Sequence, residues 1–537
     1  MFGEGACSGL EDGCVVQERG EGHRRRIFLN PNPSDIWIGR KTLEDHLRGC
    51  REQGVFAIRE LIQGMSWERF ENRYRGGGRP GYHPAVMMSL ILFGILEGRS
   101  SLRELETLGC MDARCWWLTG GVQPDHSGIC RFLILHGEDL TENYFEDLTK
   151  EVIRRIGSSG GTVSGDGTVI QAAASRYRRL QAEVALEQAR ETARQAEAAL
   201  EQAGEGSEQG EKELERQKLK RQVEKSRELA ELIEKRQEAR RVHRYKGELQ
   251  ISVTDPEAAI QPLKSKEYRP SYRPSILARE DRVVVAKGVH ATSEVEVVAG
   301  MLEQAKRVNG APEVLLLDAG YFHEKVLELG VNDPDLKHLL CPEGKTIGDG
   351  SWERKWGGEV PKSEFVYEEW RNRYRCPQGR YLYARQESYT DRGKGYVVYR
   401  CADCQSCEKK AQCVPKNRNC RELKRYEDEE LKEAMREVMR QPGARSLYRR
   451  RQGMVEPVFA ELQGLQGLRR FRRFGLRAVS LEFSLHLMAH NLRRLIKLTA
   501  KAASRSLGAP SGLLERLFDW LVDFLAAWLR FRYALTG

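Results

Sequence analysis

Two aspartates follow short apolar runs, at positions where a carboxylate needs a compensating partner. Asp166 lies between two glycines in VSGDGTVIQAAAS, and Asp318 ends the run EVLLLD. Burying a carboxylate without a partner is strongly unfavourable. Open sheets also place their functional sites at the carboxyl ends of strands. Each aspartate is therefore either a structural turn residue or a ligand for a divalent cation, which prefers oxygen donors.

A pair of divalent cations normally needs a third carboxylate. The candidate is Glu456 in YRRRQGMVEPVFAELQG, where the apolar residues are spaced as in a helix. Glu456 is one of two glutamates between Arg440 and Arg477, against ten arginines, which leaves a net charge of +8. Nearly all of the chain's net charge of +10 therefore lies in this stretch, which predicts a phosphate-binding surface.

The segment RRFRRFGLR (469–477) alternates arginine pairs with Phe471 and Phe474. Arginine suits bidentate phosphate contacts, and aromatic rings can stack on an unpaired base. We expect the arginines to contact DNA, because no nearby acid in the sequence neutralises them, and the phenylalanines to belong to the core. The predicted DNA-binding residues are Tyr448, Arg449, Arg450, Arg451, Arg469, Arg470, Arg472, Arg473 and Arg477.

Cysteines form a second group with metal-ligand spacing. In a chain without a signal peptide, such a cluster more often binds metal than forms disulfides. A four-thiolate zinc site would hold together a segment that is otherwise poor in apolar residues. An iron–sulfur cluster and unligated thiols are the alternatives. The candidate zinc ligands are Cys376 or Cys401 together with Cys404, Cys407 and Cys413, while Cys420 follows them and the isolated Cys110, Cys115 and Cys130 are expected in the core.

The elements that must position these residues follow from the apolar periodicity. Strands are predicted at 274–280, 282–290 and 313–322, with a helix at about 293–308 between the last two. Residues 177–245 contain no proline, phenylalanine or tryptophan. Apolar residues recur there at alternating spacings of four and three, which predicts an antiparallel helical hairpin. It serves either as a solvated appendage or as an arm for dimerisation or DNA contact.

The composition describes a globular protein, with 40% hydrophobic and 31% charged residues in 537. The most apolar run, 517–531, carries Asp519 and Asp523 one helical turn apart, so it is predicted to be an amphipathic helix for core packing or subunit contact. The first residues lack the apolar segment of a secretory signal. We therefore expect no membrane association and a cytoplasmic location.

Several motifs in order resemble the DDE transposases of bacterial insertion sequences, in the IS four/five superfamily branch with a cysteine-bearing insertion. They are YHPAVMMSLILFGILEGRSSLRELE, DHSGICRF, DGT with AAAS, LLLDAGYF, and the Tyr448, Arg451 and EPVF pattern followed by GLRRFRRFGLRAVSLEFSLHLMAHNLRRL. The resemblance covers about residues 80–497. It implies an RNase H-like fold in which Asp166, Asp318 and Glu456 hold two Mg²⁺ or Mn²⁺ ions, about 3.5 to 4 Å apart, for phosphoryl transfer.

The sequence departs from the family signature in two places. The interval from Arg451 to Glu456 is one residue longer than the commonest form, and the signature lysine seven residues after the glutamate is Gln463. An arginine among 469–473 could take over the lysine's phosphate contact. Of the other residues in family-like segments, Asp255 is expected in a turn rather than as an auxiliary acid, Glu296 in the helical stretch, and His490 and Asn491 in helix packing.

We thus predict an α/β RNase H-like catalytic core, a mixed sheet flanked by helices, that cuts terminal inverted repeats and joins the ends to target DNA. The partners would be double-stranded DNA and a second copy of the chain, at the bacterial nucleoid. A metal-dependent DNA endonuclease and a DNA-binding protein derived from a transposase are the rivals. The predicted segments are a disordered N-terminus (1–33), a helical DNA-binding domain (34–160), the catalytic core (161–176, 246–345 and 426–500), the hairpin insertion (177–245), the cysteine-rich insertion (346–425) and a C-terminal helix (501–537).

Overall fold

The structure is a computed structural model in which the chain forms two compact units. The first unit comprises Met1–His136, Asp147–Ser159 and Leu487–Gly537, and the second comprises Gly137–Glu146 and Gly160–His486. The described residues are 36–50, 53–74, 80–157, 160–202, 210–242, 248–343, 360, 362–391, 394–415 and 418–506, and before these only 14–16, 27–29 and 34. The predicted helix at 517–531 lies outside them.

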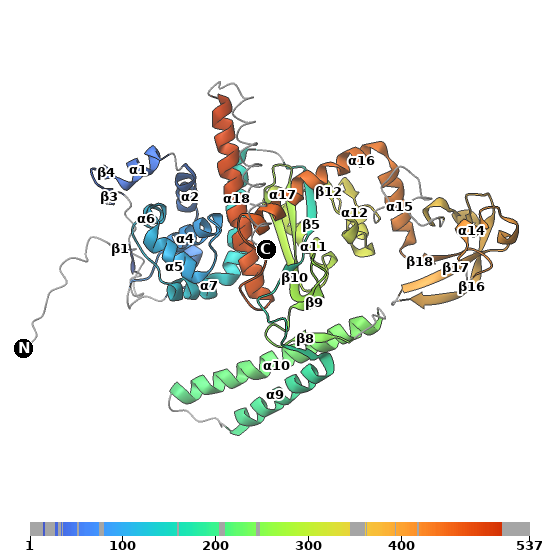
Figure 1. Ribbon diagram of the computed structural model, residues 1–537, viewed down its shortest axis with the longest axis horizontal. Helices are drawn as coiled ribbons and strands as arrows, with labels where there is room; N and C mark the ends of the chain where they lie inside the picture. The colour runs from blue at the N-terminus through green and yellow to red at the C-terminus, as the bar shows by residue number, and fades with distance from the viewer. Residues whose placement is uncertain are drawn as a thin grey trace, which may run out of the picture. The chain divides into compact units, whose positions relative to one another are not determined.

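Helices build the first unit, as the sequence pattern predicts (Figure 1). Helix α4 starts at Pro84, whose missing N–H costs nothing in a first turn. Helix α5 starts with the predicted capping box, in which Ser101 and Glu104 each accept a hydrogen bond from the other's backbone N–H. The helices are α1 (Leu43–Gly49), α2 (Gln53–Gln63), α3 (Glu68–Glu71), α4 (Pro84–Leu96), α5 (Leu102–Met111), α6 (Ala113–Thr119), α7 (His126–Asp139) and α8 (Phe145–Ile156).

Short strands precede these helices. Within the predicted disordered segment 1–33, strands β1 (Cys14–Val16) and β2 (Ile27–Leu29) pair in antiparallel fashion, so that prediction is wrong for these six residues. The rest of the segment lies outside the described residues. Strands β3 (Trp37–Ile38) and β4 (Lys41–Thr42) form a second small pair. Within the described ranges, no helix combines the length and apolarity that a bilayer crossing requires.

The second unit contains a mixed sheet with the strand order β11-β10-β5-β12-β13. Strand β12 runs parallel to β5 and β13, whereas β10 runs antiparallel to β5 and β11. The described chain is therefore mixed α/β, as predicted. The strands are β5 (Thr162–Gly167), β10 (Tyr268–Arg279), β11 (Val284–His290), β12 (Val314–Leu316) and β13 (His338–Leu340), with β6 (Ile170–Gln171) and β9 (Ala259–Pro262) also paired to β10.

The parallel register of β5 and β12 brings the two aspartates to the same level. Leu316 pairs with Ser164, so extending the register by two residues sets Asp318 opposite Asp166. Gly165 makes this approach possible, because a Cβ at that position would lie 2.4 Å from a methyl carbon of Leu317. The helices that accompany this sheet in the second unit are α11 (Val298–Asn309), α12 (Glu324–Asn332), α15 (Glu429–Arg440), α16 (Pro442–Tyr448) and α17 (Arg450–Gly464). Helix α18 (Leu476–Ser506) begins in the second unit, and its residues from Leu487 onward belong to the first.

Helices α9 (Ala182–Gln202) and α10 (Gly210–Val242) lie side by side in the range predicted to form a hairpin (Figure 1). They run antiparallel, because Arg190 pairs with Glu234 at 2.5 Å and Glu197 with Arg227 at 2.8 Å. Alanines of α9 face the partner helix and are buried, which lets the two backbones approach closely. Strands β7 (Arg179–Gln181) and β8 (Gln250–Ser252) pair where the chain enters and leaves the two helices.

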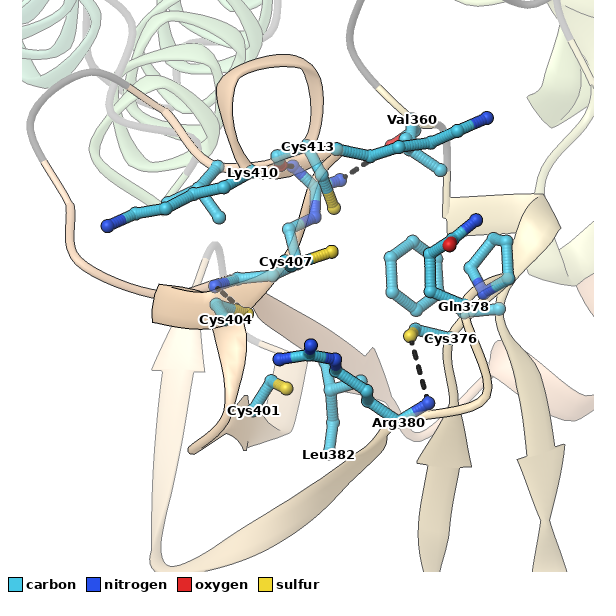
Figure 2. A pocket seen from close by; sticks show the side chains of 15 residues that line it. Val360, Cys376, Gln378, Arg380, Leu382, Cys401, Cys404, Cys407, Lys410 and Cys413 are labelled. Carbon is cyan, nitrogen blue, oxygen red and sulfur yellow. Dashed lines mark hydrogen bonds between the residues drawn. The ribbon is translucent and has the colours of Figure 1, made fainter.

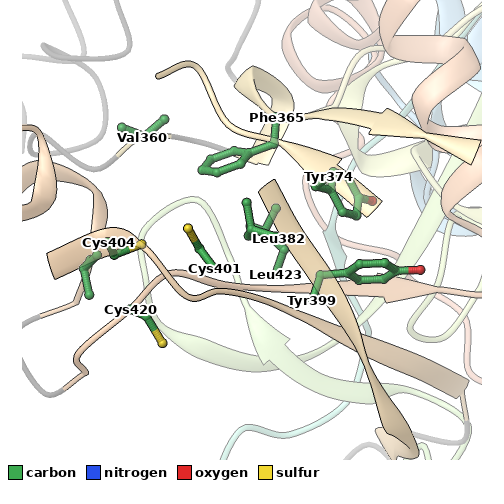
Figure 3. Packing of buried hydrophobic residues seen from close by; sticks show 10 residues of the cluster. Val360, Phe365, Tyr374, Leu382, Tyr399, Cys401, Cys404, Cys420 and Leu423 are labelled. Carbon is green, nitrogen blue, oxygen red and sulfur yellow. The ribbon is translucent and has the colours of Figure 1, made fainter. Parts of the chain in front are cut away.

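The cysteine-rich segment folds as a five-stranded antiparallel sheet with its own core. Phe365, Tyr374, Leu382, Tyr399 and Leu423 are buried together in it (Figure 3). The expectation of a segment poor in apolar residues is therefore wrong, because aromatic and aliphatic residues from neighbouring strands together supply a buried surface. The strands are β14 (Val366–Glu368), β15 (Arg373–Arg375), β16 (Tyr381–Asp391), β17 (Lys394–Cys401) and β18 (Glu422–Tyr426).

Candidate active site

Arg451 connects the two aspartates at the carboxyl ends of β5 and β12. Its Nη2 atom lies 2.8 Å from Asp166 Oδ1 and 3.7 Å from Asp318 Oδ2. The Arg451 side chain is 9% exposed, against 18% for Asp166 and 36% for Asp318. Its Nε also donates a hydrogen bond to Gly165 O at 3.3 Å. A buried guanidinium therefore compensates a pair of carboxylates that still reach solvent.

The local chain holds each carboxylate in a defined orientation. Burial raises the pKa of Asp166, the charge of Arg451 opposes this, and the neighbouring Asp318 adds to it. Asp318 caps the 3-10 helix Ala319–Tyr321, since its Oδ1 accepts a hydrogen bond from Gly320 N at 2.9 Å. Burial raises the pKa of Tyr448 to about 12, and Arg451 lowers it while Asp318 raises it. Tyr448 thus lies within the electrostatic reach of the same site.

A third carboxylate beside the two aspartates is Glu294, which the sequence analysis missed. A Cβ added to Gly167 would lie 2.5 Å from the carboxyl carbon of Glu294. Burial raises the pKa of Glu294, Arg273 opposes this, and both Asp318 and Asp166 add to it. Arg273 Nη1 donates to Glu294 Oε1 at 3.0 Å. In the sequence, only the position of Glu294 shortly after a predicted strand, two residues before Glu296, pointed to a role at the site.

Glu456 lies exposed on α17, the helix that also carries Arg451 and packs against β5. Gln463, seven residues further on, shares a side of the helix with Glu456 because seven residues make about two turns. Gln463 Nε2 donates to the Thr168 hydroxyl at 3.5 Å, just beyond the Asp166 strand. The side of α17 that carries Glu456 therefore borders the end of β5.

Pro457 interrupts the hydrogen bonding of α17 directly after Glu456. A proline has no N–H to donate to the carbonyl four residues earlier, here that of Gly453. Arg282 Nε donates to Gly453 O instead, at 3.0 Å. Arg282 adopts a positive φ of 67° in the turn between β10 and β11. A side chain from the sheet thus supplies the missing donor and ties the Glu456 helix to β10 and β11.

Two of the predicted DNA-binding arginines, both outside the 469–477 segment, pair with carboxylates that are distant in the sequence. Arg450 pairs with Glu280 at 2.6 Å, and Arg451 pairs with Asp166. Sequence distance hid these acids, since they lie on β5 and next to β10. Arg449, Arg469 and Arg477 are exposed.

The arginine-rich segment after α17 is partly built into the protein. Arg470 donates to the carbonyl oxygens of Ala172, Ala173 and Ala174, at 3.1, 2.5 and 3.3 Å. The buried carboxylate of Glu482 accepts hydrogen bonds from the backbone N–H groups of Arg472 and Arg473. Burial raises the pKa of Glu482, and these N–H groups and the two guanidinium charges oppose the rise. The segment is therefore held in a fixed path.

The two phenylalanines of that segment differ in burial. Phe471 is buried and packs edge-on against Tyr272, with 6.1 Å between the ring centroids. Phe474 is 56% exposed, so its predicted place in the core is wrong. A glycine follows it with a positive φ, and the resulting turn carries the ring away from the core.

Other residues flagged in the sequence have structural partners. Asp255 is buried and accepts a hydrogen bond from the Tyr272 hydroxyl at 2.8 Å. Glu296 pairs with Lys325 at 2.8 Å. Asn491 donates to the Thr149 hydroxyl at 3.1 Å and is buried, as His490 is. Of the isolated cysteines, Cys115 is buried and Cys130 partly buried, but Cys110 is exposed, so its predicted place in the core is wrong.

The cysteines of the antiparallel sheet line one cavity of about 260 Å³ (Figure 2). As they stand, no group of three or more histidine, cysteine, aspartate or glutamate side chains in the described ranges has the arrangement of a metal site. Cys420 does not line the cavity; its Sγ accepts a hydrogen bond from Arg400 Nε at 2.7 Å. The lining cysteines are Cys376, Cys401, Cys404, Cys407 and Cys413.

Comparison with known proteins adds two family matches. Residues 375–496 match the family model described as Transposase DDE domain, and residues 44–134 match Transposase domain (DUF772). Glu456 and Arg451 lie within the first match, whereas Asp166 and Asp318 lie outside both. Neither the curated proteins nor the solved structures contain a match. The two matches, in separate parts of the chain, support a DDE transposase.

Proposed function

We propose that this chain binds the terminal inverted repeats of a bacterial insertion sequence, cleaves the DNA ends and joins them to target DNA. Asp166, Asp318 and Glu456 would be the ligands for two Mg²⁺ or Mn²⁺ ions. The observation that carries the proposal is the meeting of Asp166 and Asp318 on one guanidinium nitrogen at the ends of parallel strands. These two carboxylates contact one guanidinium group and remain accessible to solvent. Carboxylate oxygens are the ligands that a hard divalent cation prefers.

Strand order supports an RNase H-like core. In chain order, β5, β10, β11, β12 and β13 take the spatial order 3-2-1-4-5, with only β10 running opposite to the others. Asp166 lies on the first of these strands and Asp318 just after the fourth, which are neighbours in the sheet. This arrangement brings together residues that are far apart in the sequence.

The chain's own residues would bind and orient the DNA. When bound, the cations would activate the attacking water or 3′-hydroxyl and stabilise the leaving oxygen. The exposed guanidinium groups of Arg449, Arg469 and Arg477 would bind backbone phosphates. Tyr448, half-buried beside the aspartates, would orient the phosphate at the cut. Two ends must be joined together, so a homodimer is the smallest assembly that we propose.

The test is a cleavage and strand-transfer assay on DNA that carries the element's own flanking ends, with Mg²⁺ or Mn²⁺. Native protein should yield joined products, and Asp166→Asn, Asp318→Asn and Glu456→Gln should each lower their yield at least ~100-fold. Glu296→Gln is the matched control, because this exposed glutamate pairs with Lys325 rather than with the aspartates. Cleaved but unjoined ends would favour an endonuclease. Ends that are bound and never cut would favour a DNA-binding protein.

The third carboxylate needs a separate comparison, because Glu294 lies beside the aspartates and Glu456 lies exposed on α17. We expect Glu456→Gln to abolish joining and Glu294→Gln to weaken it by about tenfold, through a changed charge beside Asp166. The opposite order of effects would make Glu294 the third ligand and would remove Glu456 from the triad. Both variants keep the length of the side chain, so packing is matched.

A further inference from the structure

The cysteine cavity is built from four short segments of the antiparallel sheet. Cys376 lies in the turn between β15 and β16, and Cys401 ends β17. Cys404 begins the 3-10 helix Cys404–Ser406, Cys407 follows it, and Cys413 ends the helix α14 (Lys410–Cys413). Thiols from these separate segments converge on one space, as Figure 2 shows. The sheet already has an aromatic core, so packing alone does not explain why these thiols lie together.

Backbone N–H groups point at two of the sulfurs from different parts of the sheet. Arg380 N donates to Cys376 Sγ at 3.2 Å, in a tight turn where Gly379 has a φ of +74° (Figure 2). Arg421 N donates to Cys404 Sγ at 3.4 Å. Hydrogen bonds to sulfur stabilise the thiolate over the thiol. The thiolate is the form that binds metal.

Positive charge surrounds the same cavity. Arg380, Lys410 and Arg421 line it, and the described residues of the lining include no aspartate or glutamate. Arg380 also donates to Ser406 at 3.0 Å, and Arg421 to the carbonyls of Cys413 and Val360 at 3.0 Å, so both guanidinium groups are fixed there. Four thiolates around a divalent ion carry a net charge of about −2, which these cations balance.

Two cysteines differ from the rest in burial and surroundings. Cys401 ends β17, pairs in the ladder with Leu382 and, at 2% exposed, is the most buried of the five cysteines that line the cavity; Cys404, at 7%, belongs to the same hydrophobic cluster (Figure 3). Cys420 belongs to the same cluster, faces away from the cavity and accepts its hydrogen bond from Arg400. Cys407 and Cys413 are only half-buried; Cys407 directly follows the 3-10 helix Cys404–Ser406, and Cys413 ends α14.

We propose that Cys376, Cys404, Cys407 and Cys413 bind one zinc ion as a four-thiolate structural site, with Cys401 and Cys420 outside it. Thiolate donors select zinc over the hard cations proposed for the aspartates. The cavity of about 260 Å³ is wider than four sulfurs at zinc-binding distance require, so metal binding draws the 404–413 segment toward the Cys376 turn. This site is independent of the proposed DNA chemistry.

Metal analysis of the full chain, purified without chelator, tests this proposal. Native protein should contain about one zinc per chain. Cys376→Ser, Cys404→Ser, Cys407→Ser and Cys413→Ser should each lose most of it, whereas Cys401→Ser and Cys420→Ser are the matched controls and should keep it. Zinc that survives the Cys404→Ser change, or that is lost equally in Cys401→Ser, would overturn the ligand set. Iron with acid-labile sulfide in place of zinc would overturn the metal.

A measurement on the native protein alone covers the case in which a variant fails to fold. Cobalt substitution should give thiolate-to-metal charge transfer and the visible bands of tetrahedral cobalt. Removing zinc with a chelator should make four additional thiols reactive toward a thiol reagent in the folded chain. A cobalt spectrum without thiolate charge transfer, or no change in thiol reactivity after chelation, would overturn the proposal.

Discussion

At the scale of single residues, Arg451 is the part of the candidate site with the greatest structural consequence. It is nearly buried and touches both aspartates through one nitrogen. Arginine keeps its charge when buried, so it can compensate these carboxylates whatever else is bound. Its neighbour Arg450 makes an exposed pair with Glu280. Two adjacent arginines of one sequence motif thus have very different surroundings.

Arg451→Met should lower the free energy of unfolding by about 3 kcal/mol in a chelating buffer, because it leaves Asp166 without its partner. Arg450→Met is the matched control and should cost about 0.5 kcal/mol, as expected for an exposed pair. Urea denaturation measures both. Added Mg²⁺ should stabilise the Arg451 variant more than the native chain, because its carboxylates lack a cation. Equal losses in the two variants would show that Asp166 does not depend on Arg451.

His486 makes the second residue-scale prediction, through pH. Burial lowers its pKa to about 3, and its Nδ1 lies 2.8 Å from Gln466 Oε1. The unfolded chain binds a proton near pH 6.5 while the folded chain does not. The stability that neutral His486 provides is therefore complete above about pH 6.5 and falls as the pH drops toward 3, by at most ~1.4 kcal/mol per unit.

Denaturation at pH 7 and pH 5 should accordingly show a smaller difference for His486→Asn, which can retain a donor toward Gln466, than for the native chain. The exposed His338→Asn should behave as native. An unchanged pH response in the His486 variant would mean that other groups cause the loss of stability in acid.

At the scale of elements, helices α9 and α10 depend on small residues where they meet. Ala185, Ala189, Ala193 and Ala196 of α9 are buried, while the outer side of that helix is charged. Alanine is the best helix former and lets two backbones come close. Near the start of α9, Ala182 and Ala185 pack with Ile233 of α10 and Ile251 of β8 in a small buried cluster. The two helices therefore hold together through one narrow seam.

Ala193→Glu should open this seam, because it buries a charge against α10 and costs about 2 kcal/mol of packing. Limited proteolysis should then cut within 182–242 much faster, while fragments of the sheet stay resistant. Gln188→Glu, on the exposed side of the same helix, should leave the cleavage pattern unchanged. Equal protection of both variants would mean that the two helices do not stabilise each other.

At the scale of the whole molecule, positive surface charge is the property that would attract the proposed DNA partner. The chain carries a net charge of +10, and most of the excess lies between Arg440 and Arg477. Exposure alone does not make an arginine available, however. Arg470 and Arg477 are both exposed, but the guanidinium of Arg470 donates hydrogen bonds to three backbone carbonyls. Counting charges along the sequence therefore overstates the surface available to phosphates.

Arg477→Ala should weaken binding to duplex DNA and reduce the slope of log affinity against log salt by about 1, because one phosphate contact is lost. Arg470→Ala should leave that slope unchanged and instead lower the free energy of unfolding by roughly 1–3 kcal/mol. DNA binding measured at several salt concentrations separates the two effects. A reduced slope in the Arg470 variant would place that guanidinium on DNA.

Local features of the sequence were sufficient for much of the organisation. The apolar run before Asp318, the Ser101 and Glu104 capping box and the spacing of alanines in α9 each depend on neighbours within a few residues. Such patterns predict the element and its buried side because helix and strand periods are short. The order of the motifs likewise pointed to a DDE transposase, which the two family matches support.

Tertiary structure alone decided which distant residues meet. Arg451 contacts Asp166 across 285 positions, and Arg470 contacts residues almost 300 positions earlier. Glu294 lies near the aspartates because β11, which precedes it, pairs with β10. No periodicity in the sequence predicts this proximity. The burial of Phe471, the exposure of Phe474 and the aromatic core beneath the cysteines also depend on long-range packing. Local spacing sets what a segment becomes, whereas partners are set by the register of the sheet and by the packing of helices against it.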